Sequence, residues 1–308
     1  MKIFIRIFFV LLFIVVVGLI FAGNYFYNYA VVPSEKSFLE SDTPGTKVKK
    51  SADQEWFEQA TGRTDWHLTA EDGLKLRAIY IPSDSPSTKT ALVVHGYMGK
   101  ADTMAAYAKM YHDMGYNVLV PDARGHGQSE GDYIGFGWHE RRDMVGWIDE
   151  IIQKNGSDET ITLFGISMGA ATVMMTAGEP LPKNVVSIVE DCGYASVNEE
   201  LTYQLKELFG LPAFPLIPVT SLVTKVRANY FFGEADVVKQ LHKNQLPILF
   251  IHGDADTFVP FHMLDEVYEA TNGPKEKWVV PGAEHAKSYA VDPEQYRQKV
   301  KAFLEKYN

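Results

Sequence analysis

The sequence contains very little cysteine and has no surplus of basic charge, and both shortages narrow the classes of protein to consider. Its 308 residues include one cysteine, so no disulfide can form within the chain and the core alone must stabilise the fold. The formal net charge is −10, which disfavours nucleic-acid binding and electrostatic attraction to anionic lipid. No glycine-rich phosphate loop follows the first predicted parallel strand, so the sequence predicts no nucleotide cofactor.

Charge is also missing from most of the N-terminal segment. Lys2 and Arg6 lie near the start of an apolar segment that extends to Ala22. This segment has about the twenty residues needed to cross a bilayer. A cleaved signal peptide and an uncleaved anchor both fit this run. The anchor is favoured because spaced small residues for cleavage are missing, and because the aromatic residues 25–29 resemble an interfacial belt. We expect residues 1–30 to be a transmembrane anchor, with its basic N-terminus in the cytoplasm and the rest of the chain extracellular.

The most informative stretch is residues 165–169, Gly-Ile-Ser-Met-Gly. It follows a β-branched run at 160–164 and precedes a run of small helix-forming residues. A serine at such a tight strand-to-helix turn presents its hydroxyl at the carboxyl edge of the sheet, beside a helix N-terminus. This pattern predicts Ser167 as a nucleophile. A glycine-rich turn whose serine only caps the helix is the alternative, and partners elsewhere in the chain must decide.

Two later strands are each followed by the partners that such a serine needs. Residues 247–251 precede a segment with Asp254 and Asp256, and residues 278–280 precede His285. A serine hydroxyl needs an imidazole to take its proton, and the imidazole needs a carboxylate to fix its tautomer. Serine, acid and histidine in this order, each just after a strand, is the chain order of α/β-hydrolases.

On these motifs the chain resembles the α/β-hydrolases over about residues 65 to 305. It is most similar to bacterial membrane-anchored or exported esterases related to prolyl-oligopeptidase-like (S9-like) serine hydrolases. The resemblance implies an α/β-hydrolase fold: a mostly parallel central sheet with helices on both faces and a small cap insertion. It also implies Ser167 as nucleophile, Asp256 as acid and His285 as base. The family pattern His-Gly-x-x-Asp-x-x-Val-Pro selects Asp256, and Asp254 is expected to form a turn.

The resemblance also implies an oxyanion hole. A buried strand at 91–94 is followed by His-Gly-Tyr-Met-Gly, a loop that in the family turns a backbone N–H toward the substrate carbonyl. The two donors are then the backbone N–H groups of Tyr97 and Met168. His95 is expected to brace this loop. The phenol of Tyr97 has two interpretations, contact with substrate or a wall of the pocket.

Other polar residues in these motifs have structural interpretations. After the strand at 116–120, Asp122 and Arg124 are expected to form an ion pair, and His126 to brace its loop. His252 and the two aspartates that follow it could be read as metal ligands, but no matching cluster lies nearby in the sequence. We therefore expect no metal and no organic cofactor.

Three segments complete the predicted organisation. Residues 31–54, a mixture of charged residues with Ser and Pro, are expected to be a stalk, and residues 55–308 the hydrolase domain. At about 193–245 a helix-like stretch gives way to an apolar segment broken by prolines, where α/β-hydrolases insert a cap. The cap is expected to wall the acyl pocket. Its apolar character fits a hydrophobic pocket or contact with a bilayer surface, and an ordinary excursion packed on the core is the alternative.

The predicted function is hydrolysis of carboxylic esters with small to medium acyl groups, through an acyl-enzyme on the serine. The partners are a small-molecule ester and the membrane, with no nucleic acid; the oligomeric state is not predicted. A peptidase or amidase of the prolyl-oligopeptidase-like group is the first alternative, although the β-propeller of those peptidases has no counterpart here. A non-catalytic envelope protein is the second. The natural substrate is not predicted, because it depends on the shape of the cap.

Overall fold

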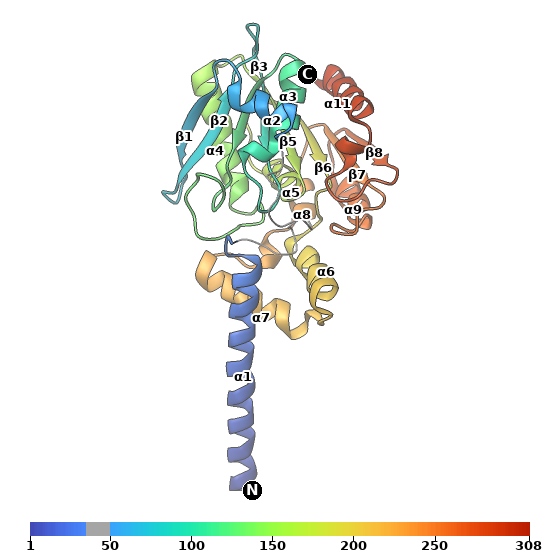
Figure 1. The fold of residues 1–308 in the computed structure, drawn as a ribbon. Helices are drawn as coiled ribbons and strands as arrows, with labels where there is room; N and C mark the ends of the chain where they lie inside the picture. Colours follow the sequence, from blue (N-terminus) through green and yellow to red (C-terminus); the bar gives the residue numbers. More distant parts are fainter. Residues whose placement is uncertain (35–49) are drawn as a thin grey trace.

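The computed structural model describes residues 1–34 and 50–308, which form one eight-stranded sheet with helices on both faces (Figure 1). The spatial strand order is β1-β2-β4-β3-β5-β6-β7-β8. Antiparallel pairing joins β1 to β2 and β2 to β4, and the remaining neighbours are parallel. The expected mostly parallel sheet is therefore confirmed. The strands are β1 (Thr64–Thr69), β2 (Lys75–Ile81), β3 (Lys89–Val94), β4 (Asn117–Pro121), β5 (Thr160–Ile166), β6 (Val185–Asp191), β7 (Ile248–Gly253) and β8 (Lys275–Val280).

Two apolar clusters fill the space between the sheet and its helices. In β3, Leu92 and Val94 belong to one cluster and Ala91 and Val93 to the other, as the two-residue period of a strand requires when both faces are covered. The first cluster includes residues of α4 (Glu140–Asn155), α5 (Met168–Thr176), α8 (Val237–Leu241) and α9 (His262–Ala270). The second includes residues of α2 (Ala52–Gln59), η2 (Ala101–Met104), α3 (Ala105–Asp113) and α11 (Pro293–Tyr307).

Two further helices lie beside the carboxyl end of the sheet. These are α6 (Val197–Phe209) and α7 (Ala213–Ala228), which we call the cap (Figure 1). The short η3 (Phe232–Glu234) follows α7, and α10 (Ser288–Val291) precedes α11. The insertion expected at 193–245 also contains α8, whose Val237 and Leu241 are fully buried in the domain core. The part of the insertion that stands apart from the core is therefore α6 and α7.

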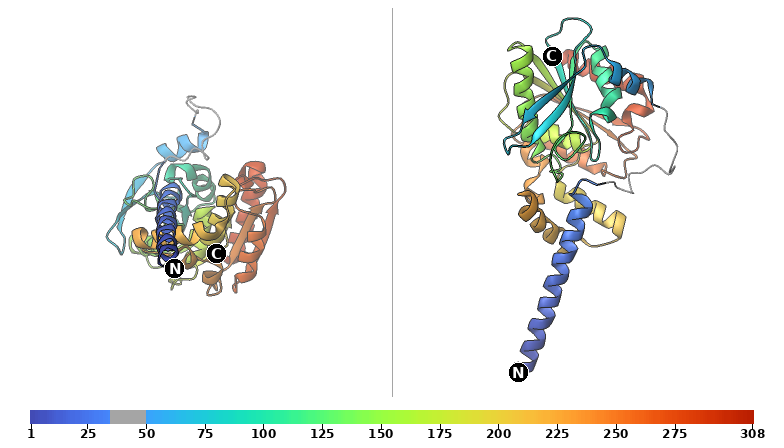
Figure 2. Two further views of the ribbon diagram at one scale, coloured as in Figure 1. Left: turned by 90° about the horizontal axis from the view of Figure 1, so that it is seen from below. Right: turned by 60° about the vertical axis from the view of Figure 1, so that its left-hand side comes forward.

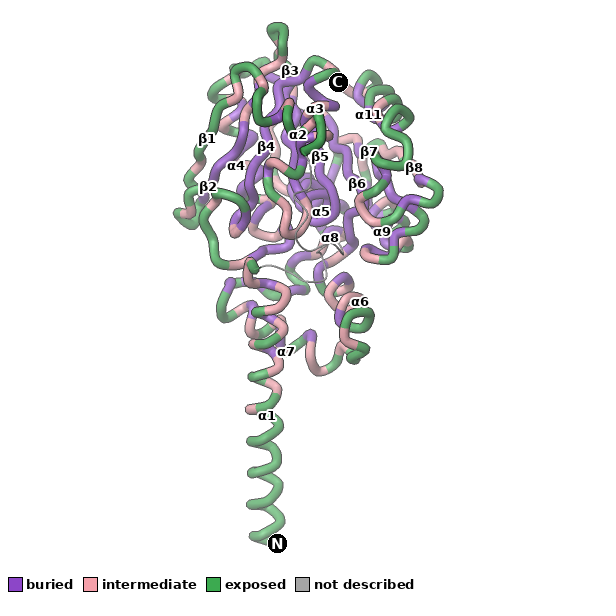
Figure 3. The backbone as a smooth tube through the Cα atoms, in the orientation of Figure 1, coloured by how far each residue is buried: buried purple, intermediate pink, exposed green. Residues whose placement is uncertain are grey.

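The N-terminal helix α1 (Lys2–Ala30) projects from the domain for most of its length (Figure 2). Among the described residues it is the one helix long and apolar enough to cross a membrane, a test that signal sequences also pass. Its first two thirds are mostly exposed, whereas its C-terminal end is partly covered by protein (Figure 3). Gly23 and Tyr27 are its buried residues. The end of the helix expected to be only an anchor is thus packed against the domain.

The expected stalk lies mostly at residues 35–49, outside the described residues. Its two described ends both pack on the domain. Val31 is fully buried, and its carbonyl accepts a hydrogen bond of 2.8 Å from the backbone N–H of Ile134. At the other end, α2 begins at Ala52 behind a capping box on Ser51, three residues before the expected start of the domain. Structure that belongs to the domain therefore reaches into both ends of the expected stalk.

The expected ion pair between Asp122 and Arg124 is wrong, because each side chain has a different partner. Asp122 accepts a hydrogen bond from Arg77 on β2 at 3.2 Å. Arg124 forms a two-point pair with the buried Asp143 of α4, at 2.8 and 2.7 Å, and also contacts Asp72 at 2.7 Å. Because the two side chains bind different elements, they hold the loop after β4 in place through two separate sets of contacts.

Candidate active site

The turn that carries Ser167 is held in an unusual backbone conformation by two glycines. Ser167 lies between β5 and α5 with φ 55° and ψ −121°, a region that side-chain-bearing residues rarely adopt. A Cβ at Gly165 would lie 2.1 Å from the carbonyl oxygen of Gly169, and one at Gly169 would lie 2.2 Å from that of Val94. Any larger residue at either position would displace the backbone. The sequence motif therefore forms the tight strand-to-helix turn that was expected of it.

The structure brings together the three side chains expected to form the triad. His285 Nε2 lies 2.9 Å from Ser167 Oγ, and His285 Nδ1 lies 2.7 Å from Asp256 Oδ2. Asp256 follows β7 and His285 follows β8, so neighbouring parallel strands deliver both partners to one edge of the sheet. With Nδ1–H donated to the carboxylate, Nε2 is free to take the serine proton. This arrangement can perform nucleophilic acyl transfer.

The carboxylate of Asp256 is held in its ionised form. Its Oδ1 accepts backbone hydrogen bonds from Phe258 and Val259, at 2.8 and 2.9 Å. Burial acts to raise the pKa of Asp256, but hydrogen bonds from His252 and His285 outweigh it and hold the pKa well below its usual range. The acid therefore stays negative at neutral pH and can orient the imidazole and stabilise its protonated form.

The competing acid, Asp254, has a different contact. Its Oδ1 accepts a hydrogen bond of 2.6 Å from the backbone N–H of Gly282, in the loop that carries His285. Asp254 therefore ties the acid loop to the base loop. His252, fully buried, directs Nε2 to the carbonyl of Val259 at 3.1 Å and contacts Asp256 at 3.3 Å. Both residues support the acid loop through these contacts.

The loop after β3 lies directly against the nucleophile. A Cβ at Gly96 would lie 3.3 Å from the Cβ of Ser167. Tyr97 follows Gly96 in this loop, and Met168 is the first residue of α5, so its N–H has no acceptor within the helix. Both residues line the cavity next to Ser167. These two backbone N–H groups remain our candidates for the oxyanion hole.

Two buried histidines hold this loop in place. His95 Nε2 accepts a hydrogen bond of 3.0 Å from the backbone N–H of Ala123, so its Nδ1 donates to the carbonyl of Gly96. Burial lowers the pKa of His95 to about 4, and the ring is therefore neutral at physiological pH. His126 Nε2 accepts from the backbone N–H of Met98 at 3.2 Å. His95 and His126 thus have the bracing contacts expected of them.

The two interpretations of the Tyr97 phenol are separated by its partner. The hydroxyl donates a hydrogen bond of 2.8 Å to the carbonyl of Ala30, the last residue of α1. The ring stacks on Phe136 at a centroid distance of 5.5 Å and lines the cavity beside Ser167. Tyr97 is therefore a wall of the pocket whose hydroxyl is bound to the N-terminal helix.

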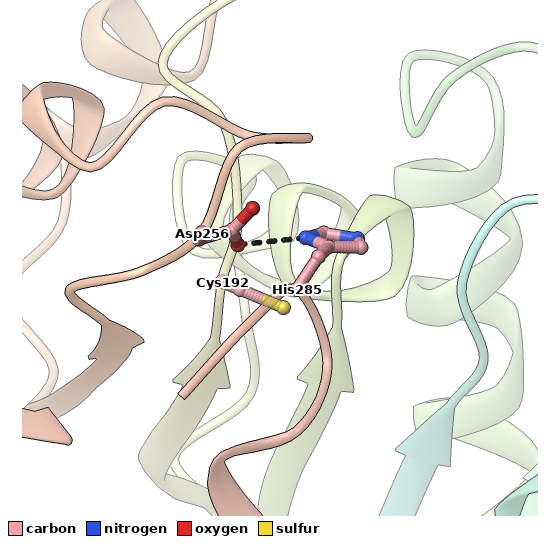
Figure 4. A group of neighbouring side chains, drawn as sticks. All are labelled: Cys192, Asp256 and His285. Carbon is pink, nitrogen blue, oxygen red and sulfur yellow. Dashed lines mark hydrogen bonds and ion pairs between the residues drawn. The ribbon is translucent and has the colours of Figure 1, made fainter. Parts of the chain in front are cut away.

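Cys192 lies beside the acid and the base, and the three could be considered as metal ligands (Figure 4). The cluster differs from the His252, Asp254 and Asp256 set considered from the sequence. Its donor chemistry is unfavourable, because burial, reinforced by the nearby Asp191 carboxylate, raises the pKa of the Cys192 thiol well above its usual value. The ligands are also engaged, since the dashed line in Figure 4 is the hydrogen bond between Asp256 and His285. These residues do not fit a metal centre.

A largely apolar cavity opens next to Ser167, with a volume of about 820 Å³ including the space open to solvent. Its floor is formed by Ser167, Met168 and Tyr97. Its walls come from three helices: α6, α7 and the end of α1, which contributes Phe26 and Tyr29. The lining is mostly hydrophobic and aromatic, as in pockets that bind apolar ligands. The sequence predicted that the cap would wall this pocket, but it gave no sign that α1 takes part.

Glu200 is a pocket residue that the sequence analysis missed. It lies on α6 with 4% of its surface exposed, and it lines the cavity. Oε1 accepts a hydrogen bond of 2.9 Å from Gln204, whereas Oε2 is buried without a partner. Burial, reinforced by the negative charge of Asp256, raises the pKa of Glu200 to about 8. At neutral pH the pocket therefore holds a neutral carboxyl group.

Because the carboxyl group is neutral in the folded state, a proton is bound on folding. We therefore expect the stability of Glu200→Gln to rise relative to that of the wild type as pH increases. The folded pKa of Glu200 lies near 8, above the ordinary glutamate value of 4.5, so the folded state binds more protons between these values. The contribution of Glu200 to wild-type stability is fully present below pH 4.5 and is lost through this window, by roughly 5 kcal/mol at most. Glutamine does not titrate, so the stability of the variant does not decrease through this window.

The measurement is the thermal midpoint of the full chain in detergent, for wild type and variant, from pH 5 to pH 9. The variant should gain on the wild type by about 5–10 °C across this range. Glu207→Gln is the matched control, because Glu207 lies on the same helix and is exposed. A difference between Glu200→Gln and wild type that stays constant with pH would show that Glu200 is ionised in the folded protein.

Comparison with known proteins gives one family and several relatives. The family described as X-Pro dipeptidyl-peptidase (S15 family) matches residues 72–230. Protein YqkD of Bacillus subtilis (strain 168) is 30% identical over 277 residues, which cover 88% of this chain and 90% of its own. The thermostable monoacylglycerol lipase of Bacillus sp. (strain H-257) is 23% identical over 219 residues, covering 61% of this chain and 78% of its own.

The solved structure of the esterase Pf2001 of Pyrococcus furiosus is similar in fold. It superposes with a TM-score of 0.67 at 24% identity and covers 90% of this chain and 97% of that chain. At this identity the likeness shows the shared fold, which is that of an α/β-hydrolase. The expected fold class is thereby confirmed by a second, independent observation.

Proposed function

Since the chain belongs to the X-Pro dipeptidyl-peptidase (S15) family and is a serine hydrolase of the α/β-hydrolase fold, we propose that it hydrolyses carboxylic esters of apolar acyl chains. The observation that carries this proposal is the apolar cavity that opens directly onto Ser167. Two similar proteins support it by their names, a monoacylglycerol lipase and an esterase. Ser167, His285 and Asp256 are proposed as the catalytic residues.

The proposed reaction proceeds in two halves. Ser167 Oγ attacks the ester carbonyl while His285 Nε2 takes its proton, and the resulting oxyanion accepts hydrogen bonds from the backbone N–H groups of Tyr97 and Met168. His285 then protonates the departing alcohol, which leaves an acyl-enzyme. Water attacks this acyl group with His285 again as base, and the carboxylic acid is released as Ser167 regains its proton. Asp256 stays ionised throughout.

A second function, release of X-Pro dipeptides, has one observation in its favour besides the family name. Glu200 lines the largely apolar pocket and its Oε2 has no partner, and a peptide carries a positive α-amino group that could pair with this carboxyl group. Against this, pairing would require ionising a carboxyl group that burial keeps neutral. We therefore place ester hydrolysis first.

Hydrolysis of p-nitrophenyl esters with acyl chains of graded length tests the proposal, using the full chain in detergent. We expect turnover that rises to a maximum at a definite chain length, because each buried methylene adds about 0.8 kcal/mol of binding until the pocket is filled. A p-nitroanilide of an X-Pro dipeptide is the comparison substrate, and its kcat/KM should be at least about 100-fold lower. Faster cleavage of the anilide would reverse the order of the two functions.

We also propose that α1 remains attached and spans the membrane, with the catalytic domain extracellular. The basic residues Lys2 and Arg6 lie at its free end, which favours a cytoplasmic N-terminus. Cleavage near residue 30 would remove Tyr27, which is 2% exposed and belongs to the domain core. Protease added to intact cells should digest the domain, and full protection would reverse the orientation.

A further inference from the structure

The C-terminal third of α1 is built into the wall of the active-site pocket. It packs along α7 through Gly23, where a Cβ would lie 2.7 Å from a side-chain carbon of Val219. Arg227 of α7 places its guanidinium 4.0 Å from the centre of the Tyr27 ring and donates a hydrogen bond of 2.9 Å to Asn28. Figure 2 shows the two helices side by side. This end of α1 is therefore fixed relative to the cap.

The part of α1 that packs on nothing has the length of one bilayer. Residues 2–21 are exposed apart from two partly buried positions, and at 1.5 Å per residue they extend about 30 Å. The hydrocarbon core of a bilayer is also about 30 Å thick. If these residues span the membrane, its surface falls near residue 22, at the level where α7 begins to contact α1. The cap then lies at the membrane surface.

Exposed apolar side chains gather on this same part of the molecule. Outside residues 1–30, the described residues include seven large apolar side chains that are exposed, and six of them lie between residues 208 and 231. Phe214 is 78% exposed, Leu222 55% and Val226 80%. Clusters of this kind on a soluble surface mark a contact with a membrane or a partner. They belong to the cap and to the segment just after it, and the cap packs on α1 next to its exposed length, which favours the membrane as the contact.

The cavity beside Ser167 is lined by α1 and by the cap. Phe26 and Tyr29 of α1 form one side of it, and α6 forms the other. The two sides meet at Phe209, whose ring contacts Phe26 at 5.3 Å and Tyr29 at 5.0 Å between centroids. Leu208, the neighbouring lining residue, is 42% exposed and so marks an outer end of the cavity. That end adjoins the apolar patch.

We propose that the enzyme takes a bilayer-resident single-chain acyl ester, whose acyl chain enters from the membrane between α1 and α6. The membrane helix is then one wall of the acyl-binding site as well as an anchor. This inference rests on the proposed ester hydrolysis. A bilayer concentrates long-chain esters, and the free energy of removing their chains from lipid is recovered when the same methylenes contact the apolar wall.

The membrane contact is tested without reference to turnover. Cys192 is buried, so a cysteine introduced at an exposed site can be labelled selectively with an environment-sensitive fluorophore. In vesicles of phosphatidylcholine, the label on Phe214→Cys should emit at shorter wavelength and be quenched by spin-labelled lipid. Val291→Cys is the control, because Val291 is 51% exposed on α10, away from the cap. Blue-shifted emission without lipid quenching would indicate a protein partner, and water-like emission an uncovered cap; either overturns the proposal.

The role of α1 as a wall is tested by chain-length preference. In vesicles, Phe26→Ala should lower the ratio of kcat/KM for p-nitrophenyl myristate over that for p-nitrophenyl acetate by about tenfold. The matched control is Phe21→Ala, because Phe21 is 73% exposed on the same helix and does not line the cavity. An equal ratio in both variants would contradict the proposal that α1 forms one wall of the acyl-binding site. Absence of all ester turnover in a wild type that lies at the lipid surface would instead refute ester hydrolysis.

Discussion

Ser167→Ala is expected to reduce turnover of activated esters by about 10⁶-fold, the loss typical of removing the nucleophile from a serine hydrolase. The substitution deletes the oxygen that lies 2.9 Å from His285 Nε2 and leaves no atom there to form the acyl-enzyme. The backbone N–H donors and the pocket remain, so a small residual rate above the uncatalysed reaction is expected. The measurement is kcat for the best p-nitrophenyl ester, with the full chain in detergent.

Folding must be shown to survive this substitution. Alanine is smaller than serine and meets the same backbone strain, so the thermal midpoint should change little. Ser157→Ala, in an exposed loop, is the control that should keep full activity. Covalent labelling by a fluorophosphonate should occur in wild type and in the control and be lost in Ser167→Ala. If that variant retained more than about one per cent of the activity, Ser167 would not be the nucleophile.

The second large effect is expected from Asp256→Asn, which should lower kcat by about 10³- to 10⁴-fold. The side-chain amide would donate a hydrogen bond to Nδ1 of His285, at the position where Asp256 Oδ2 now accepts one at 2.7 Å. The proton of the imidazole would then lie on Nε2, which faces Ser167 and could no longer accept the serine proton. The geometry of the triad would be kept, but His285 could no longer act as the base.

Asp254→Asn is the matched control for this experiment, since the same chemical change is made two residues away. Asp254 bonds to the backbone of Gly282, so its loss should affect the thermal midpoint more than kcat, which should fall less than about tenfold. The kcat values of the two variants at saturating ester, with thermal midpoints measured in parallel, separate the two roles. If Asp254→Asn had the larger effect on kcat, the acid would be Asp254.

Local sequence was enough to predict most of the candidate site. Gly165 and Gly169 flank a serine at a strand-to-helix junction, and the steric reason for both glycines acts within a few residues. His285 and the two candidate acids were found because they follow short apolar runs that form parallel strands, and the family pattern then selected Asp256 over Asp254. Parallel strands end at one edge of the sheet, so residues far apart in sequence are brought together by a rule that the sequence itself reveals.

Contacts between distant elements could not be predicted in this way. The aromatic residues near the end of α1 suggested an interfacial belt, yet Tyr27 is buried in the domain core and Phe26 lines the cavity. An aromatic residue has the same sequence signature whether it meets lipid headgroups or protein. Arg124 was paired with a neighbour in sequence because its true partner, Asp143, lies on the next helix.

A signal for Glu200 was present in the sequence. Val197, Leu201 and Leu205 recur at the spacing of one helical face, and Glu200 and Gln204 fall on the same face. Polar residues within a buried stripe are uncommon and indicate a site. The functional residue was therefore visible as an exception to a pattern whose partner surface, the cavity, appears only in the structure.

The packing of α1 into the domain also determines how the enzyme would move. Tyr27 and Val31 are both buried in the domain core, so among the described residues the end of α1, the proposed membrane helix, packs directly on the catalytic domain. An enzyme joined to its anchor by a flexible linker samples a volume above the membrane and meets lipid by chance collisions. An enzyme packed rigidly on its membrane helix would hold its active site at a constant height and orientation above the membrane. Its search for substrate would then be lateral diffusion in two dimensions.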